Sequence, residues 1–247
     1  MWRKQENVLI MCVLIGRRWL RFLPGLGRLV GFARYLTELV FAYFDARWRI
    51  SPESRILFLD LGANTGQAFS FFSKVFSRGK VTFELFEPNP HCLETLTAVV
   101  QDFRGKAILH QKAVGTGNTS ALLYGLAVDE GGPLSQGASL LLEHNSSRYR
   151  PSSEQAVRVE VVDLAPFLER RRNQYDLVVV KMDIEGMEIE LLNHLVQTQA
   201  IEAIDVLYLE LHSSYLSETE QKEAVAAEMR ITSALRRLGS LRFRAWH

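Results

Sequence analysis

Short apolar runs alternate with segments of helical periodicity from about residue 55 to the end of this 247-residue chain. Runs typical of strands occupy residues 56–59, 81–87, 107–114, 157–162, 177–180, 206–212 and 241–245. Between them, apolar residues spaced three or four positions apart predict helices, as at Phe69, Phe72 and Phe76. This alternation predicts an α/β fold in which a doubly wound, mostly parallel sheet carries helices on both faces.

The first fifty residues break this pattern and predict a separate segment. They carry nine Lys/Arg and three Asp/Glu, and residues 29–44 are amphipathic at helical spacing. The apolar run at 8–15 is shorter than the roughly 20 residues that a membrane-spanning helix needs. We predict a basic amphipathic helical extension at residues 1–50 that covers the domain or, alternatively, contacts a membrane peripherally. The protein is expected to be cytoplasmic, and peripheral at a membrane in the second case.

The composition of residues 51–247, the body of the chain, excludes some classes of protein. With 20 basic and 25 acidic residues, it lacks the basic surface of a general nucleic-acid binder, so we expect no nucleic-acid partner. Cys12 and Cys92 are the only cysteines, which excludes a disulfide framework. Residues 115–155 are rich in Gly, Ser and Asn and predict an insertion over the ligand-facing edge of the domain.

A glycine turn follows the first predicted strand, at Asp60, Gly62 and Gly66. Glycines let the backbone approach a ligand closely, and the helix that follows offers free N–H groups. Glu87 ends the next strand, where a nucleotide-type fold holds ribose hydroxyls. Asn64 replaces the second glycine of the NAD fingerprint. The pattern therefore predicts a Rossmann-like domain that binds an adenosine-type ligand.

A second polar group follows the strands predicted at 177–180 and 206–212. Asp183 and Glu185 lie two residues apart, so on an extended chain their side chains point the same way. The two carboxylates would repel unless one is protonated, paired with Lys181 or His212, or bridged by a cation. Together with Glu210, these residues belong at the carboxyl edge of a parallel sheet, where such folds place their sites.

Structural alternatives exist for this group. Glu185 would cap a helix that starts at Gly186, and His212 would satisfy a backbone carbonyl. Asp183 and Glu185 are also suitable ligands for Mg²⁺. Because the sequence shows no His or Cys cluster for a transition metal, we assign no metal ligand.

Four blocks, at residues 58–66, 86–90, 181–186 and 209–212, together resemble the FkbM-type family of S-adenosylmethionine-dependent methyltransferases. The likeness extends over roughly residues 55–215, and it implies a class I methyltransferase fold and S-adenosylmethionine as the cofactor. It implies O-methylation of a small molecule, sugar or lipid headgroup. The candidate cofactor-binding residues are Asp60, Gly62, Asn64, Gly66, Glu87, Pro88 and Ala113. The candidate catalytic residues are Asp183, Glu185 and His212.

Two other functions remain open at this point. An NAD-type oxidoreductase would share the Rossmann-like fold, although Asn64 argues against it. A non-catalytic, membrane-associated binding module could keep the same fold without the chemistry. The chain also offers one strand at its end, where such methyltransferase folds usually finish with two, one of them antiparallel.

Overall fold

The computed structural model describes residues 40–45, 50–77, 79–126, 137–142, 144, 156–212 and 218–246. The chain divides into two compact units, residues 1–45 and 46–247. In the first unit only the helical residues 40–45 are described, so most of the predicted extension and its membrane contact lie outside the described residues. Among the helices that are described, none is long and apolar enough to cross a bilayer.

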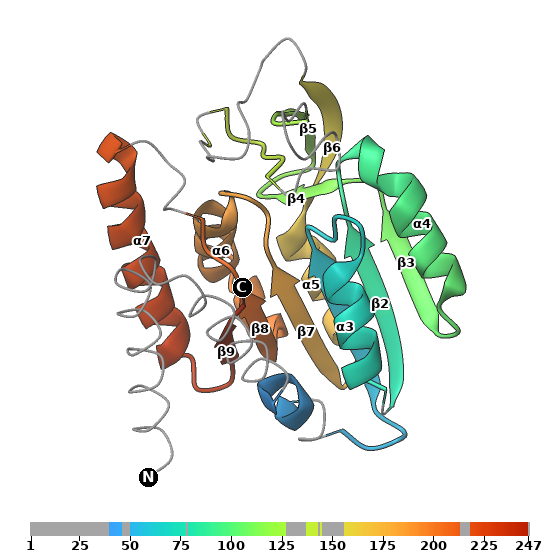
Figure 1. Cartoon of the computed structure of the whole chain (residues 1–247). Coiled ribbons are helices and arrows are strands. Elements are labelled where there is room, and N and C mark those ends of the chain that lie inside the picture. Colours follow the sequence, from blue (N-terminus) through green and yellow to red (C-terminus); the bar gives the residue numbers. More distant parts are fainter. Residues whose placement is uncertain are drawn as a thin grey trace, which may run out of the picture. The chain divides into compact units, whose positions relative to one another are not determined.

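The second unit is built on a six-stranded sheet in which all neighbouring strands are parallel (Figure 1). The strand order is β3 (Lys106–His110), β2 (Lys80–Phe86), β1 (Arg55–Leu61), β7 (Leu177–Met182), β8 (Val206–Leu209) and β9 (Arg242–Ala245). From β1 the chain builds outward to one edge through β3, and from β7 it builds to the other edge. The order therefore reverses between β1 and β7, which is where such sheets open a crevice at their carboxyl ends.

Helices cover both faces of this sheet, as the sequence predicted (Figure 1). One face carries α3 (Gln67–Val75), the short helix η2 (Pro90–Cys92) and α4 (Leu93–Asp102). The other carries α5 (Leu164–Arg172), α6 (Glu188–Gln197), the short helix η5 (Ala200–Ala203) and α7 (Glu218–Arg237).

Alternate residues of β1 supply the two halves of the core. Leu57 and Leu59 pack in the large apolar cluster that includes α5, α6 and α7. Phe58 points to the opposite face, where its ring lies 4.7 Å from that of Phe72 in α3 and 5.3 Å from that of Phe83 in β2. Every residue of β1 after Arg55 is buried, which explains why this strand reads as an unbroken apolar run except at Asp60.

A small second sheet contains β4 (Ala113–Gly115), β6 (Val157–Asp163) and β5 (Thr119–Leu123), in that order. β4 pairs with β6 in parallel, and β5 pairs with β6 antiparallel. The prediction of one strand at 107–114 is therefore wrong. The chain leaves the main sheet after His110 and re-enters regular structure in the small sheet at Ala113.

Two of these helices begin at side-chain caps. The Asn89 side chain accepts a hydrogen bond from the backbone N–H of His91, with Pro90 at the first helical position. Asp163 accepts from the backbone N–H of Ala165 at the start of α5.

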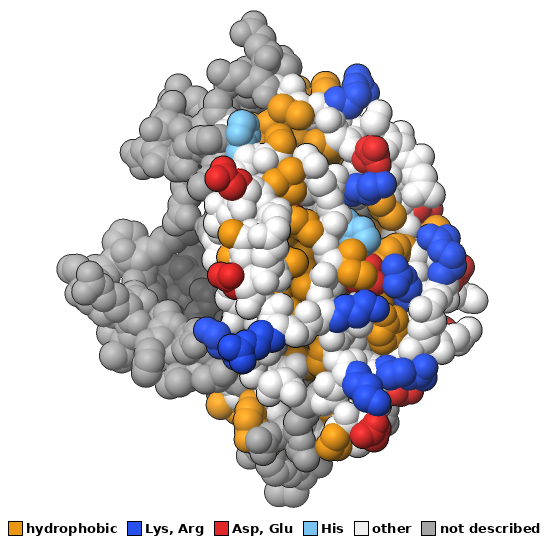
Figure 2. Space-filling view, turned by 90° about the vertical axis from the view of Figure 1, so that its right-hand side faces the viewer, with side chains coloured by type: hydrophobic (Ala, Val, Ile, Leu, Met, Phe, Trp, Pro, Cys, Tyr) orange, Lys and Arg blue, Asp and Glu red, His pale blue; other side chains and the backbone are white. Residues whose placement is uncertain are grey.

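On the face of the molecule seen in Figure 2, basic side chains are interspersed with acidic and apolar ones.

The glycine turn after β1 is shaped by protein packing. Gly62 has φ of 78°, and a Cβ at this position would lie 1.9 Å from the backbone oxygen of Asp183. Gly66 has φ of 90°, and a Cβ there would lie 3.1 Å from Leu96 and 3.3 Å from Val99 in α4. The two glycines thus let the turn approach β7 and α4 closely, whatever ligand the turn binds.

We expect Gly62→Ala to destabilise the domain by about 3 kcal/mol or more, since it adds a backbone clash to an unfavourable positive φ. Thermal unfolding should show this as a Tm lower by about 6–12 °C. Gly117→Ala is the matched control, because nothing lies within 4 Å of its added Cβ. Equal Tm values for the two variants would contradict this account of the turn.

Candidate active site

Polar side chains from four neighbouring strands converge at the carboxyl edge of the sheet, around the point where the strand order reverses. They are Asp60 of β1, Glu87 after β2, Lys181 and Asp183 at the end of β7, and Glu210 and His212 after β8. Glu185 and Glu188 join them from the loop and first turn that lead into α6. Most of these side chains are buried, so the group forms a buried charged cluster rather than a solvated surface.

Lys181 links the two central strands. Its Nζ atom lies 3.3 Å from Oδ1 of Asp60 and 3.2 Å from Oδ2 of Asp183, and it donates a 2.8 Å hydrogen bond to the backbone oxygen of Gly62. Burial disfavours its charge, but the two carboxylates outweigh burial and raise the pKa of Lys181 above its usual value. Burial raises the pKa of Asp60, although the ammonium group of Lys181 opposes that shift.

Glu87 is held by the backbone on both carboxylate oxygens. The N–H of Asn64, which has φ of 47°, donates to Oε2 at 2.7 Å, and the N–H of Asn89 donates to Oε1 at 2.8 Å. The residue is only 6% exposed. Burial raises the pKa of Glu87 to about 7, even though both amides favour the ionised form. Each oxygen retains lone-pair capacity for another donor.

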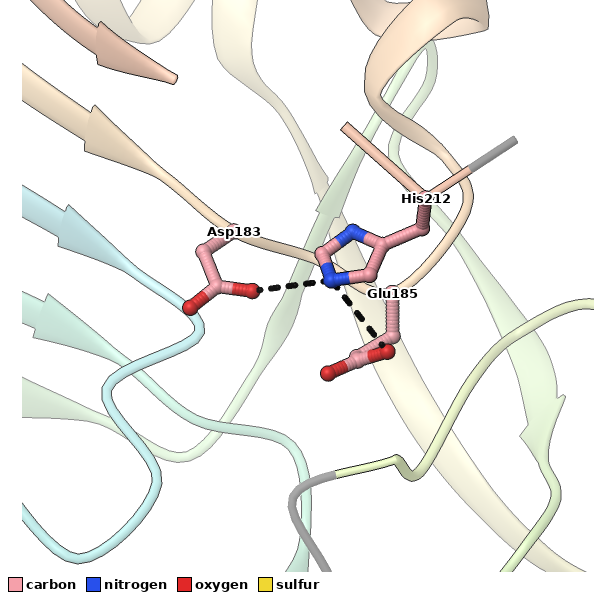
Figure 3. Close-up of side chains that lie close together, drawn as sticks. All are labelled: Asp183, Glu185 and His212. Atoms are coloured by element: carbon pink, nitrogen blue, oxygen red, sulfur yellow. Dashed lines mark ion pairs between the residues drawn. The ribbon is translucent and has the colours of Figure 1, made fainter. Parts of the chain in front are cut away.

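Both ring nitrogens of His212 lie near carboxylates, and Figure 3 shows the two carboxylates beside Nε2. Its Nε2 atom is 3.6 Å from Oδ1 of Asp183 and 3.5 Å from Oε2 of Glu185, while Nδ1 lies 2.8 Å from Oε1 of Glu188. Burial alone would lower the pKa of His212. The hydrogen bond to Glu188 and the surrounding negative charges outweigh burial and raise the pKa to about 10.

Glu188 is the residue that the sequence interpretation missed. It accepts hydrogen bonds from the backbone N–H groups of Ile184 and Gly186 at 3.0 Å and 3.1 Å. The helix begins at Glu188 and not at Gly186, and no side chain caps it at Met187, so the cap expected from Glu185 is not formed. An acidic residue in the first turn of a predicted helix was the available signal.

Glu185 has a left-handed backbone, with φ of 54°, and its side chain turns toward histidines. Besides the contact with His212, its Oε2 atom lies 3.1 Å from Nε2 of His144. The hydroxyl of Ser139 donates to the backbone oxygen of Glu185. Two residues of the predicted insertion therefore fix both the backbone and the side chain of Glu185.

The remaining candidates have different surroundings. Gly66 packs against α4, and Pro88 lies between Glu87 and the helix cap at Asn89. Ala113 lies in β4 and packs in the apolar cluster of the small sheet. Glu210 comes directly after β8. Burial is the main cause that raises the pKa of Glu210 to about 7, and the negative charge of Asp183 adds to it.

Comparison with known proteins identifies a sequence family that this chain matches. The sequence model of the family described as methyltransferase FkbM domain matches residues 60–239. No curated protein is significantly similar to the chain.

Two solved structures are similar at low identity. Methyltransferase FkbM from Methylobacillus flagellatus KT is 18% identical with a TM-score of 0.35; the match covers 65% of this chain but only 34% of that one. The plantazolicin methyltransferase BpumL in complex with SAH is 13% identical with a TM-score of 0.32. Here the match covers 96% of this chain and 78% of the other.

The buried carboxyl of Glu87 should make stability depend on pH. Its native pKa of about 7 exceeds its ordinary value of 4.5, so the native state binds this proton more tightly than the unfolded state does. This contribution is fully present below pH 4.5 and is lost as pH rises through 7. Between pH 5 and 8, the unfolding free energy of the wild type should fall by about 3 kcal/mol relative to Glu87→Gln.

Urea denaturation at several pH values measures this difference. Glu160→Gln, which changes an exposed carboxylate paired with Lys112, should follow the wild type at every pH. If the wild type and Glu87→Gln run in parallel across this range, the buried carboxyl of Glu87 does not titrate near neutrality.

Proposed function

The chain belongs to the methyltransferase FkbM domain family, and from that premise we propose that it methylates an oxygen atom of a small molecule, sugar or lipid headgroup. S-adenosylmethionine is the cofactor of this family. The observation that carries the proposal is Glu87, a buried carboxylate at the end of β2 beside the glycine turn. This is where a Rossmann-like fold holds ribose hydroxyls.

The residues around the crevice fit such a cofactor. Both oxygens of Glu87 already accept one backbone N–H each and can accept a ribose hydroxyl in addition. The described part of the crevice also holds more carboxylates than cations. The carboxylates are Asp60, Asp183, Glu185, Glu188 and Glu210, and the cations are Lys181 and His212. This negative excess favours a positively charged ligand.

When bound, S-adenosylmethionine supplies an electrophilic methyl group on a cationic sulfur; transfer to an oxygen forms the O–C bond, breaks the S–C bond and leaves S-adenosylhomocysteine. The chain has two tasks, which are to hold the acceptor in line and to take its hydroxyl proton. We assign the positioning of the acceptor to Oδ1 of Asp183, because Lys181 anchors Oδ2 of the same carboxylate. We assign the proton to the carboxylate of Glu185, because His212 with a pKa of about 10 is already protonated near neutral pH.

Cofactor affinity tests the role of Glu87. Glu87→Ala should weaken S-adenosylmethionine binding by about 2–3 kcal/mol, since it removes a charged acceptor from two hydroxyls. Isothermal titration calorimetry measures the affinity, and Glu160→Ala should leave it unchanged because that side chain is exposed. An unchanged affinity in Glu87→Ala would remove Glu87 from the cofactor site.

Turnover tests the role of Asp183. Asp183→Asn keeps the shape of the side chain and removes its charge, so the acceptor should lose its alignment and turnover should fall by roughly 10²-fold or more while Tm changes little. Methyl transfer is measured with labelled S-adenosylmethionine and a panel of hydroxylated small molecules, sugars and lipid headgroups. Asp163→Asn is the matched control, because the Asp163 side chain is 19% exposed against 24% for Asp183, and each lies beside a histidine.

A variant Asp183→Asn that keeps full turnover would exclude Asp183 from the reaction. Loss of turnover together with a large fall in Tm would assign Asp183 a structural role instead. In either case the cofactor affinity of the Glu87 variant is measured separately, so the two roles are tested independently.

A further inference from the structure

We propose that Asp183, Glu185 and His212 form a binding site for one divalent transition-metal ion, of the Mn²⁺ or Zn²⁺ class. The three side chains come from the loop after β7 and the residues after β8, and each directs one ligand atom toward the others (Figure 3). The sequence placed all three residues at this edge of the sheet but suggested only the two carboxylates as ligands for a cation. The fold adds the imidazole that turns a carboxylate pair into a mixed nitrogen and oxygen ligand set.

Two of the three separations between the ligand atoms match those around a single ion. Nε2 of His212 lies 3.6 Å from Oδ1 of Asp183 and 3.5 Å from Oε2 of Glu185, and all three ligand atoms lie within 4.8 Å of one another. With metal–ligand bonds of about 2.0–2.2 Å, the ligand atoms of a tetrahedral ion lie about 3.3–3.6 Å apart. One ion therefore fits between these atoms with small movements of the two partly buried carboxylates.

The same separations are poor for direct hydrogen bonds. A distance of 3.5–3.6 Å is at or beyond the limit of a hydrogen bond, and Nε2 has one direction in which to donate or accept. It cannot serve Asp183 and Glu185 equally. An ion placed between the three atoms would contact both carboxylates and the ring nitrogen at once.

The neighbours of these ligands have the arrangement that metal-binding histidines require. Glu188 is buried and bonds to Nδ1 of His212, which fixes the ring and aims Nε2 at the two carboxylates. Glu188 is itself held by two backbone N–H groups, so its position does not depend on the ion. His144 holds the side chain of Glu185, and Ser139 holds its backbone oxygen.

The ligand chemistry selects the class of ion. One imidazole nitrogen with two carboxylate oxygens suits Mn²⁺, Zn²⁺ and related ions, whereas Ca²⁺ and Mg²⁺ favour oxygen ligands alone. Three protein ligands leave a coordination position open, as in catalytic sites. If the proposed methyl transfer is correct, the ion would lower the pKa of an acceptor hydroxyl bound at that position, and the proton would pass to the oxygen of Glu185 that does not bind the ion. Metal binding itself does not depend on this role.

Calorimetric titration of the full chain with MnCl₂ and ZnCl₂, after treatment with a chelator and without cofactor or acceptor, tests the proposal. We expect one equivalent of at least one of these ions to bind the wild type. Glu185→Gln removes one ligand charge and should weaken binding at least tenfold. Asp163→Asn is the matched control and should bind as the wild type does, because Asp163 and Glu185 have similar exposure and each lies beside a histidine.

Thermal unfolding of each variant verifies that it is folded. If Glu185→Gln fails to fold, His212→Gln, which keeps a donor for Glu188, replaces it in the titration. Absence of saturable binding to the wild type would overturn the proposal and leave a proton on His212 as the neutralising cation. Equal affinities in the wild type and the ligand variants would also overturn it. A chain that binds the ion but transfers no methyl group would contradict the proposed function alone.

Discussion

The buried ammonium group of Lys181 is the interaction on which the rest of the crevice depends. It lies between Asp60 on β1 and Asp183 after β7, the two strands between which the chain order reverses. A buried ammonium group is tolerated only when it is paired and hydrogen-bonded, and Lys181 also donates to the backbone oxygen of Gly62. One side chain thus fixes the glycine turn, both strand ends and the orientation of Asp183. Removal of Lys181 would leave the carboxyl of Asp60 buried without a cation and that of Asp183 without its anchor.

Different devices stabilise the other carboxylates of the site. Backbone N–H groups hold Glu87 and Glu188, and these neutral donors stabilise the carboxylates without bringing another charge into the site. Glu188 also bonds to His212. These supports set different protonation preferences within one small region. Glu87 has a pKa raised to about 7 by burial, whereas the surrounding carboxylates raise that of His212 to about 10. The crevice therefore combines side chains in fixed positions with ionisable groups whose protonation a bound cation or ligand would change.

The fold could be predicted from the sequence because its signals are local. Buried parallel strands appear as apolar runs, and the caps at Asn89 and Asp163 rest on side chains that bond two residues ahead. The mistake at 107–114 has a physical reason. An apolar run indicates burial but not the sheet that buries it, and the run is shared between β3 in the main sheet and β4 in the small one.

For the site, the sequence by itself determined which residues end the strands, and hence that Asp60, Glu87, Asp183 and His212 gather at one edge. Only the tertiary structure decided what each one contacts. The sequence left protonation, pairing and a bridging cation as equal answers to the repulsion of Asp183 and Glu185. The structure pairs Asp183 with Lys181 and orients His212 through Glu188, a residue 24 positions away in the chain. Contacts over such separations depend on side-chain directions in the folded core, which no local pattern encodes.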